Sequence, residues 1–433
     1  MSNLIPRDLP LPLPAPVWLL ESLLVLSFML HILFVNLMVG GSLFTVFYQW
    51  KGKTDQRFEE LAYLVAKTLT VNKSLAVVFG VGPLLCLNVL YTTFFYSANA
   101  LTGTAWLMII PLISGAFLLT YLHKYTWHKD SLSRGSHRLI AIFAAILFLI
   151  IPFIFLVNAN LMLFPERWGE VKGFFSALLL PNVFPRYMHF IAASITVTGL
   201  FLIGYLGRSK DPSSIFKREP HFLFEARRSL YSLCFVITAA QFIIGPLVLF
   251  TLPSHGISGT MLGTLLIAIV MAMALLKFLY DEAKNPTPQL SKGFPKIVFL
   301  FTVIVALMVS IRHIYREQAL SAHKKVQTEK TQAFLDESAA AAIQTKSPAA
   351  AVSPEEKGKN AFASYCSGCH AEAKAMVGPA LTEIRDIYKT DTAGIVKWTK
   401  APGKKRPGMA MPAMNHVQED DLNAIAQWIL KTK

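Results

Sequence analysis

Eight apolar stretches follow one another through the first 315 residues of the chain. They lie at roughly 17–48, 72–95, 102–123, 138–160, 186–207, 230–252, 259–280 and 295–314. A helix of about 20 apolar residues spans the hydrocarbon core of a bilayer. No small-residue cleavage site follows the first stretch, so we expect it to be retained as a span. The pattern therefore predicts an all-α, polytopic transmembrane helical bundle over residues 1–315.

The pattern changes after this bundle. Residues 316–354 are rich in alanine and carry no apolar period, so we expect a linker that is helical near the membrane and loose beyond it. Residues 355–433 regain a helical period, and one face of the helix expected near the C-terminus is apolar, with Leu422, Ile425, Ala426 and Ile429. We therefore predict a second, small all-α domain at 355–433.

The composition agrees with a membrane protein. Hydrophobic residues make up 54% of the chain and charged residues 15%, whereas soluble domains carry about 25% charged residues. This excludes an ordinary soluble enzyme. The four cysteines are too few for a disulfide scaffold.

The net charge of +15 is concentrated in the connections between spans. Eighteen Lys and Arg residues lie around the connections after spans 1, 3, 5 and 7, against four at the N-terminus and after spans 2, 4 and 6. Cytoplasmic loops of membrane proteins are rich in Lys and Arg. We therefore expect both termini on the periplasmic side of a bacterial inner membrane, contact with membrane lipids, and no nucleic-acid partner.

The strongest motif lies in the small domain. Cys366, Cys369 and His370 form a Cys-x-x-Cys-His pattern, which is the attachment motif of a c-type haem. Two thiols one turn apart reach the two vinyl groups of one haem, and the adjacent histidine supplies an axial nitrogen. A zinc site is the alternative, but a second pair of ligands is missing. Covalent haem attachment takes place outside the cytoplasm, so one haem c agrees with the orientation expected from the loop charges.

Segment 355–433 resembles a class I cytochrome c. The resemblance rests on the helix expected over Glu355–Tyr365, on Gly378-Pro379 after the motif, and on the closing helix. It implies that the sixth iron ligand is the methionine directly before a proline, Met411, and that Met409 and Met414 pack around the haem. His416 is the alternative ligand. A haem bound by His370 and Met411 carries electrons without binding substrate, and Met/His ligation raises its reduction potential.

Two histidines lie inside the predicted spans. His31 falls in span 1 and His189 near the outer end of span 5, and buried histidines in spans are candidates for function. Neither span holds the two histidines, about four turns apart, that stacked haems need in one bundle helix. His123 and His137 straddle a basic loop. A cytochrome b with the usual four-helix, bis-histidine arrangement is therefore excluded.

Residues 20–255 resemble the large subunit of cytochrome bd oxidase. The matching motifs, in chain order, are Met29–Val35 with Gly40-Gly41, Phe79–Gly82, Leu156–Asn160 with Pro165, Arg186–His189 with Gly199, and Ala226–Ser229. The resemblance implies that His31 ligates a haem in span 1 and that His189 ligates a low-spin b haem near the outer face. Met261, two residues into span 7, would be the partner of His189. The alternatives are histidines bonded to backbone carbonyls and a packing or lipid-facing methionine.

The departures from that family concern protons and quinol. The chain has no Asp or Glu between Leu61 and Lys129, and spans 4 to 8 hold no buried acid. The connection between spans 6 and 7 is cut to Pro253–Ser258, and the family's Gly-Arg-Gln-Pro-Trp motif is missing. Oxygen reduction needs an open haem site and a proton supply, so we expect a bd-like subunit without oxidase chemistry.

These observations lead to three hypotheses about function. The first is a respiratory electron-transfer cytochrome, acting as a quinol:cytochrome c-type oxidoreductase subunit. It passes electrons between a quinol or partner subunit, one or two b haems and the periplasmic haem c. Its partners would be a periplasmic redox protein or other respiratory subunits. The second is a bd-like terminal oxidase subunit using cytochrome c or quinol. The third is a membrane anchor for a cytochrome c within a larger complex.

Overall fold

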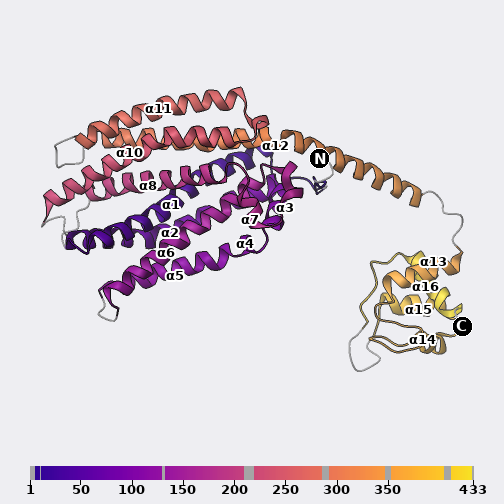
Figure 1. The fold of residues 1–433 in the computed structure, drawn as a ribbon. Helices are drawn as coiled ribbons and strands as arrows, with labels where there is room; N and C mark the ends of the chain where they lie inside the picture. The colour runs from indigo at the N-terminus through magenta and orange to yellow at the C-terminus, as the bar shows by residue number, and fades with distance from the viewer. Residues whose placement is uncertain are drawn as a thin grey trace. The chain divides into compact units, whose positions relative to one another are not determined.

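The computed structural model describes residues 5–9, 11–128, 132–208, 219–284, 292–346, 353–403 and 411–431. Over these residues the chain is helical and contains no strand. It divides into two compact units, Met1–Phe334 and Leu335–Lys433 (Figure 1). The all-α fold class predicted from the sequence is confirmed.

The membrane unit is built from long helices joined by short connections. Its elements are α1 (Val17–Lys51), α2 (Gln56–Leu90), α3 (Thr92–Thr102), α4 (Thr104–Leu107), α5 (Ile109–Tyr125), α6 (Arg134–Leu161), η2 (Pro165–Glu170), α7 (Phe174–Leu178), α8 (Val183–Arg208), α10 (Pro220–Thr251), η3 (Ser254–Gly256), α11 (Gly259–Lys284) and α12 (Phe294–Lys346). Within the described residues, seven helices are long and apolar enough to span a membrane, or eight if α2, bent by 41° between its halves, counts as one span. The predicted bundle of about eight spans is confirmed.

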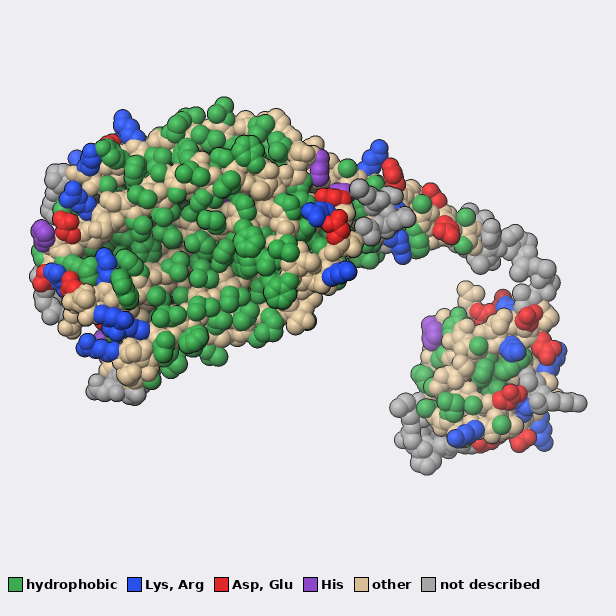
Figure 2. Space-filling view, viewed as in Figure 1, with side chains coloured by type: hydrophobic (Ala, Val, Ile, Leu, Met, Phe, Trp, Pro, Cys, Tyr) green, Lys and Arg blue, Asp and Glu red, His purple; other side chains and the backbone are tan. Residues whose placement is uncertain are grey.

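The surface of the membrane unit has the distribution expected for a bilayer. Figure 2 shows hydrophobic side chains over the middle of its visible face and charged side chains at its two ends. The C-terminal ends of α1, α5, α8 and α11 all lie at one end of the membrane unit in Figure 1. That end therefore carries the basic connections recognised in the sequence.

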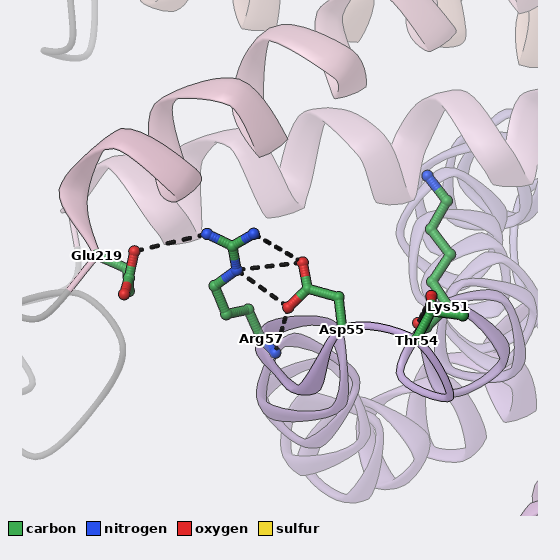
Figure 3. A network of polar contacts seen from close by, with 5 residues as sticks. All are labelled: Lys51, Thr54, Asp55, Arg57 and Glu219. Carbon is green, nitrogen blue, oxygen red and sulfur yellow. Dashed lines mark hydrogen bonds and ion pairs between the residues drawn. The ribbon is translucent and has the colours of Figure 1, made fainter.

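The turn between α1 and α2 is held by a polar network at this basic end (Figure 3). The Asp55 carboxylate caps α2 by accepting from the Arg57 amide at 3.0 Å, and the Arg57 guanidinium pairs with the same carboxylate at 2.8 Å. Arg57 also lies 3.6 Å from Glu219, the residue that precedes α10. Because the cap lies at Asp55, α2 begins well before the apolar stretch at 72–95.

Helix α12 continues beyond its apolar part. The extended N-terminal segment packs against it there: the Asp8 amide donates to Thr331 Oγ1 at 2.9 Å, and Arg7 lies 3.5 Å above the Phe334 ring. Residues up to Phe334 therefore belong to the membrane unit. The boundaries expected from the sequence, with a linker at 316–354, stay a prediction, and the part of this linker up to Lys346 is helical.

The described part of the C-terminal unit contains four short helices after the end of α12, namely α13 (Pro354–Tyr365), α14 (Leu381–Tyr388), α15 (Thr392–Lys400) and α16 (Glu419–Lys431). α13 crosses α16 closely, because a Cβ on Gly358 would lie 2.3 Å from the Ala424 carbonyl oxygen. Beside this crossing the rings of Phe362 and Trp428 lie 4.9 Å apart. The apolar face expected on the last helix is buried, with Leu422, Ile425, Ala426 and Ile429.

Candidate haem-binding sites

The Cys-x-x-Cys-His motif forms one tight turn at the end of α13. The amides of Cys369 and His370 both donate to the Cys366 carbonyl, at 3.1 and 3.0 Å. The two cysteines are not joined in a disulfide; Cys366 is half-buried and Cys369 exposed. Burial and the neighbouring Cys369 raise the pKa of the Cys366 thiol to about 11. The turn thus presents two thiols and one imidazole together, as a covalent haem requires.

The His370 ring is oriented by the loop that follows it. Its Nδ1 lies 2.9 Å from the Pro379 carbonyl oxygen, and since a carbonyl can only accept, Nδ1 carries the proton. This leaves the lone pair of Nε2 for iron, as in most histidine ligands. A Cβ on Gly378 would lie 2.3 Å from the ring, so only glycine fits behind it. The residues present therefore fit a c-type haem.

The methionines of the following loop are less completely described. Met411 is half-buried, while residues 404–410, including Met409, lie outside the described residues. Met414 packs against the core of this unit, and its amide donates to the Thr399 carbonyl at 3.0 Å. Met411 as the sixth ligand stays a prediction.

In the membrane unit, His31 lies where α1 meets α2. Its Nδ1 donates to the Ala76 carbonyl at 2.9 Å. As in His370, this leaves the lone pair of Nε2 for iron. A Cβ on Gly80 would lie 2.8 Å from the ring, so α2 is shaped around this imidazole. The geometry fits a haem ligand, and His31 as a ligand stays a prediction.

His189 on α8 lies beside Gln241 on α10. The Gln241 amide nitrogen donates to the His189 backbone carbonyl at 3.1 Å. In these neighbouring side chains, His189 Nδ1 and Gln241 Oε1 are both inaccessible to solvent and have no hydrogen-bond partner. Buried polar atoms are rarely left unpaired. A small rotation that pairs the two would satisfy both atoms and leave His189 Nε2 for iron.

Met261 on α11 is 3% exposed and belongs to a buried cluster with Ile311 and Tyr315 of α12. Its environment is that of a packing methionine. The contacts described for this unit do not join Met261 to His189, so their pairing on one haem stays a prediction.

Sequence reasoning missed the residues that support the histidines. Gln241 is a polar amide within the apolar stretch 230–252, and that interruption was the available signal. Gly80 belongs to a motif that was recognised, but its contact with His31 joins two helices and could not be read from either one. Arg186 also belongs to a recognised motif but was given no role of its own, and the half-buried Arg312 and Arg316 of α12 were not singled out.

Comparison with known proteins decides the nature of the C-terminal unit. Residues 353–429 match the family model described as cytochrome C oxidase, cbb3-type, subunit III. The C-terminal unit is a cytochrome c domain. With its Cys-x-x-Cys-His turn, a cytochrome c domain implies one covalent haem c. Among curated proteins, no sequence matches the chain.

The membrane unit resembles a solved respiratory oxidase in fold. The structure of bd oxidase from Geobacillus thermodenitrificans matches with a TM-score of 0.57 and 14% sequence identity, over 70% of this chain and 88% of that one. Seventy per cent of the chain is far more than the cytochrome c domain contains, so the match falls mainly on the membrane unit. The likeness to bd oxidase expected from the sequence is thereby confirmed as a likeness of fold.

Proposed function

We propose that this protein is a membrane-bound respiratory electron-transfer cytochrome. It passes electrons between a quinol or partner subunit, one or two b haems in the membrane unit, and the haem c of the C-terminal domain. One observation carries the proposal: the chain that holds the cytochrome c domain also holds two span histidines, His31, whose Nδ1 donates to the Ala76 carbonyl, and His189, whose buried Nδ1 has no hydrogen-bond partner. The bound haems supply reversible one-electron chemistry, and the protein positions them and keeps water away.

We place the cytochrome c domain on the periplasmic side of a bacterial inner membrane. The concentration of Lys and Arg at the end of the bundle with the α1–α2 turn supports a cytoplasmic position for that end. Attachment of haem to Cys366 and Cys369 outside the cytoplasm supports the same orientation. A periplasmic redox protein or another respiratory subunit is then the natural partner of haem c.

A bd-like terminal oxidase is the second candidate, favoured by the fold of the membrane unit. Against it stands the lack of any Asp or Glu between Leu61 and Lys129. Oxygen reduction consumes protons, and carboxylates within spans are usual components of proton relays. Carbon monoxide binding and oxygen consumption by the purified protein would establish the oxidase.

The deciding experiment measures haem type and number per chain in the purified protein by pyridine haemochrome spectra. We expect both haem b and haem c in the unaltered protein. His31→Leu and His189→Leu should each reduce haem b while keeping haem c, and the exposed His221 supplies a control as His221→Leu. A wild-type spectrum with haem c alone would overturn the proposal and leave the membrane unit as an anchor.

The sixth ligand of haem c is tested separately. Met411→Leu should open the iron to carbon monoxide and lower its midpoint potential, because a thioether ligand raises the potential. Met414→Leu is the matched control, since Met414 packs in the core of the domain. If Met414→Leu opens the iron to carbon monoxide and Met411→Leu does not, the sixth ligand is Met414.

A further inference from the structure

Three arginines converge at the end of the bundle where α8 begins. Arg186 comes from α8, and Arg312 and Arg316 come from successive turns of α12. Each lies close enough to the other two for their charges to act on one another. The Arg312 guanidinium lies 4.6 Å from the centre of the Phe28 ring, and that of Arg316 lies 5.0 Å from the Tyr91 ring.

The carboxylates at this end are engaged elsewhere. Glu317 pairs with Lys324 at 2.6 Å, Glu21 lies 3.9 Å from His313, and Glu166 lies 3.4 Å from His323. Throughout the described ranges, no ion pair joins any of the three arginines to a carboxylate.

The arginine cluster is therefore three like charges without a direct ion pair in the described chain, and Glu317 reaches Arg316 only through the Tyr91 hydroxyl. Arg316 Nη1 is inaccessible to solvent and has no hydrogen-bond partner. Removing a charge from water costs several kcal/mol unless an opposite charge compensates it. An anion with more than one negative charge would supply that compensation, and guanidinium groups bind carboxylate and phosphate oxygens in pairs.

The neighbours of the cluster indicate which anion this is. Arg186 precedes His189 by three residues on α8, so both project from the same side of the helix, and the charge of Arg186 acts on His189. Arg186 also lies near Tyr315, which shares a buried cluster with Met261. Within the cluster, Arg186 is therefore the arginine near His189, and through Tyr315 it lies close to the buried cluster that contains Met261, the predicted partner of His189 on the second membrane haem.

We propose that Arg186, Arg312 and Arg316 form an oxyanion site for the two propionate carboxylates of the haem ligated by His189. This inference rests on the proposed function, because it needs a b haem at His189. The site would fix the haem in the bundle. It would also raise the haem's midpoint potential, since nearby positive charge favours the reduced state. A lipid phosphate offers the same oxyanion chemistry and is the alternative source.

The experiment compares Arg312→Gln and Arg316→Gln with Arg227→Gln, a buried arginine on α10 where that helix begins. The covalent haem c of each chain serves as the internal standard for haem b. We expect both cluster variants to lower the ratio of haem b to haem c by up to half and to shift the midpoint potential of the remaining haem b downward. Arg227→Gln should change neither value.

Two further measurements keep the inference falsifiable. Arg316→Lys keeps a charge in the cluster and should restore the potential toward the wild-type value even if the ratio stays lowered. Native mass spectrometry reports bound phospholipid. If the Gln variants lose phospholipid while the ratio and potential of haem b stay unchanged, the anion at this site is a lipid phosphate and not the haem carboxylates. If wild type contains haem b and the Gln variants keep its ratio, potential and lipids, this inference fails alone. If wild type contains no haem b, the proposed function fails with it.

Discussion

Gly378→Ala tests whether the loop behind His370 holds the imidazole for iron. The added Cβ would lie 2.3 Å from His370 Cε1 and 2.7 Å from each ring nitrogen. Ordinary contacts begin near 3.4 Å, so the ring or the loop must move by about 1.1 Å, the difference between the two distances. A shift of that size separates a good hydrogen bond from none, and it places the 2.9 Å bond to Pro379 at risk.

The magnitude follows from these two effects. Overpacking costs about 1–3 kcal/mol, and the lost hydrogen bond about 0.5–1.5 kcal/mol, so the free energy of unfolding should fall by roughly 2–4 kcal/mol. For a domain of this size that lowers Tm by at least about 8 °C. The measurement is thermal unfolding of the full chain followed by haem c absorbance, together with the spectrum that reports histidine ligation.

Gly368→Ala is the matched control within the same motif. No atom lies within 4 Å of the Cβ it would add, so a change within about 0.5 kcal/mol is expected, as for surface substitutions. Equal Tm values and equal spectra for the two variants would refute the role given to Gly378 and to the orientation of His370.

Other changes test the remaining parts of the structure. Gly80→Ala places a Cβ 2.8 Å from His31 and should lower haem b per chain, whereas Gly245→Ala meets nothing within 4 Å and should not; equal haem b would contradict the contact. Gly358→Ala should lower the unfolding free energy of the cytochrome c domain by about 1–3 kcal/mol in chemical denaturation; an unchanged midpoint would argue against the close crossing of α13 and α16. Asp55→Ala removes the cap of α2 and should cost about 1 kcal/mol. The Arg57 hydrogen bond holds the pKa of Asp55 below its ordinary value. The stabilisation by the cap is therefore present at neutral pH and should disappear only as the pH falls below about 4. A Tm difference between Asp55→Ala and wild type that persists below that pH would contradict this expectation.

The sequence by itself determined the features that are local along the chain. About 20 consecutive apolar residues indicate a span, and Cys366, Cys369 and His370 within five positions indicate the haem turn. Both could be read without knowing any contact. The helical continuation of α12 to Lys346 was less visible, because a polar helix outside the membrane leaves no apolar period.

Tertiary structure decided the contacts between distant segments. The pairing of His189 with Gln241 joins α8 to α10, and the packing of Gly80 on His31 joins α2 to α1. The convergence of Arg186 with Arg312 depends on how α8 packs relative to α12. Side-chain periodicity shows that a helix has an inner face, but not which residue of another helix it meets there. The haem c motif can therefore be identified from the sequence alone, because its residues are adjacent in the chain. The surroundings of the membrane histidines form only when the helices pack.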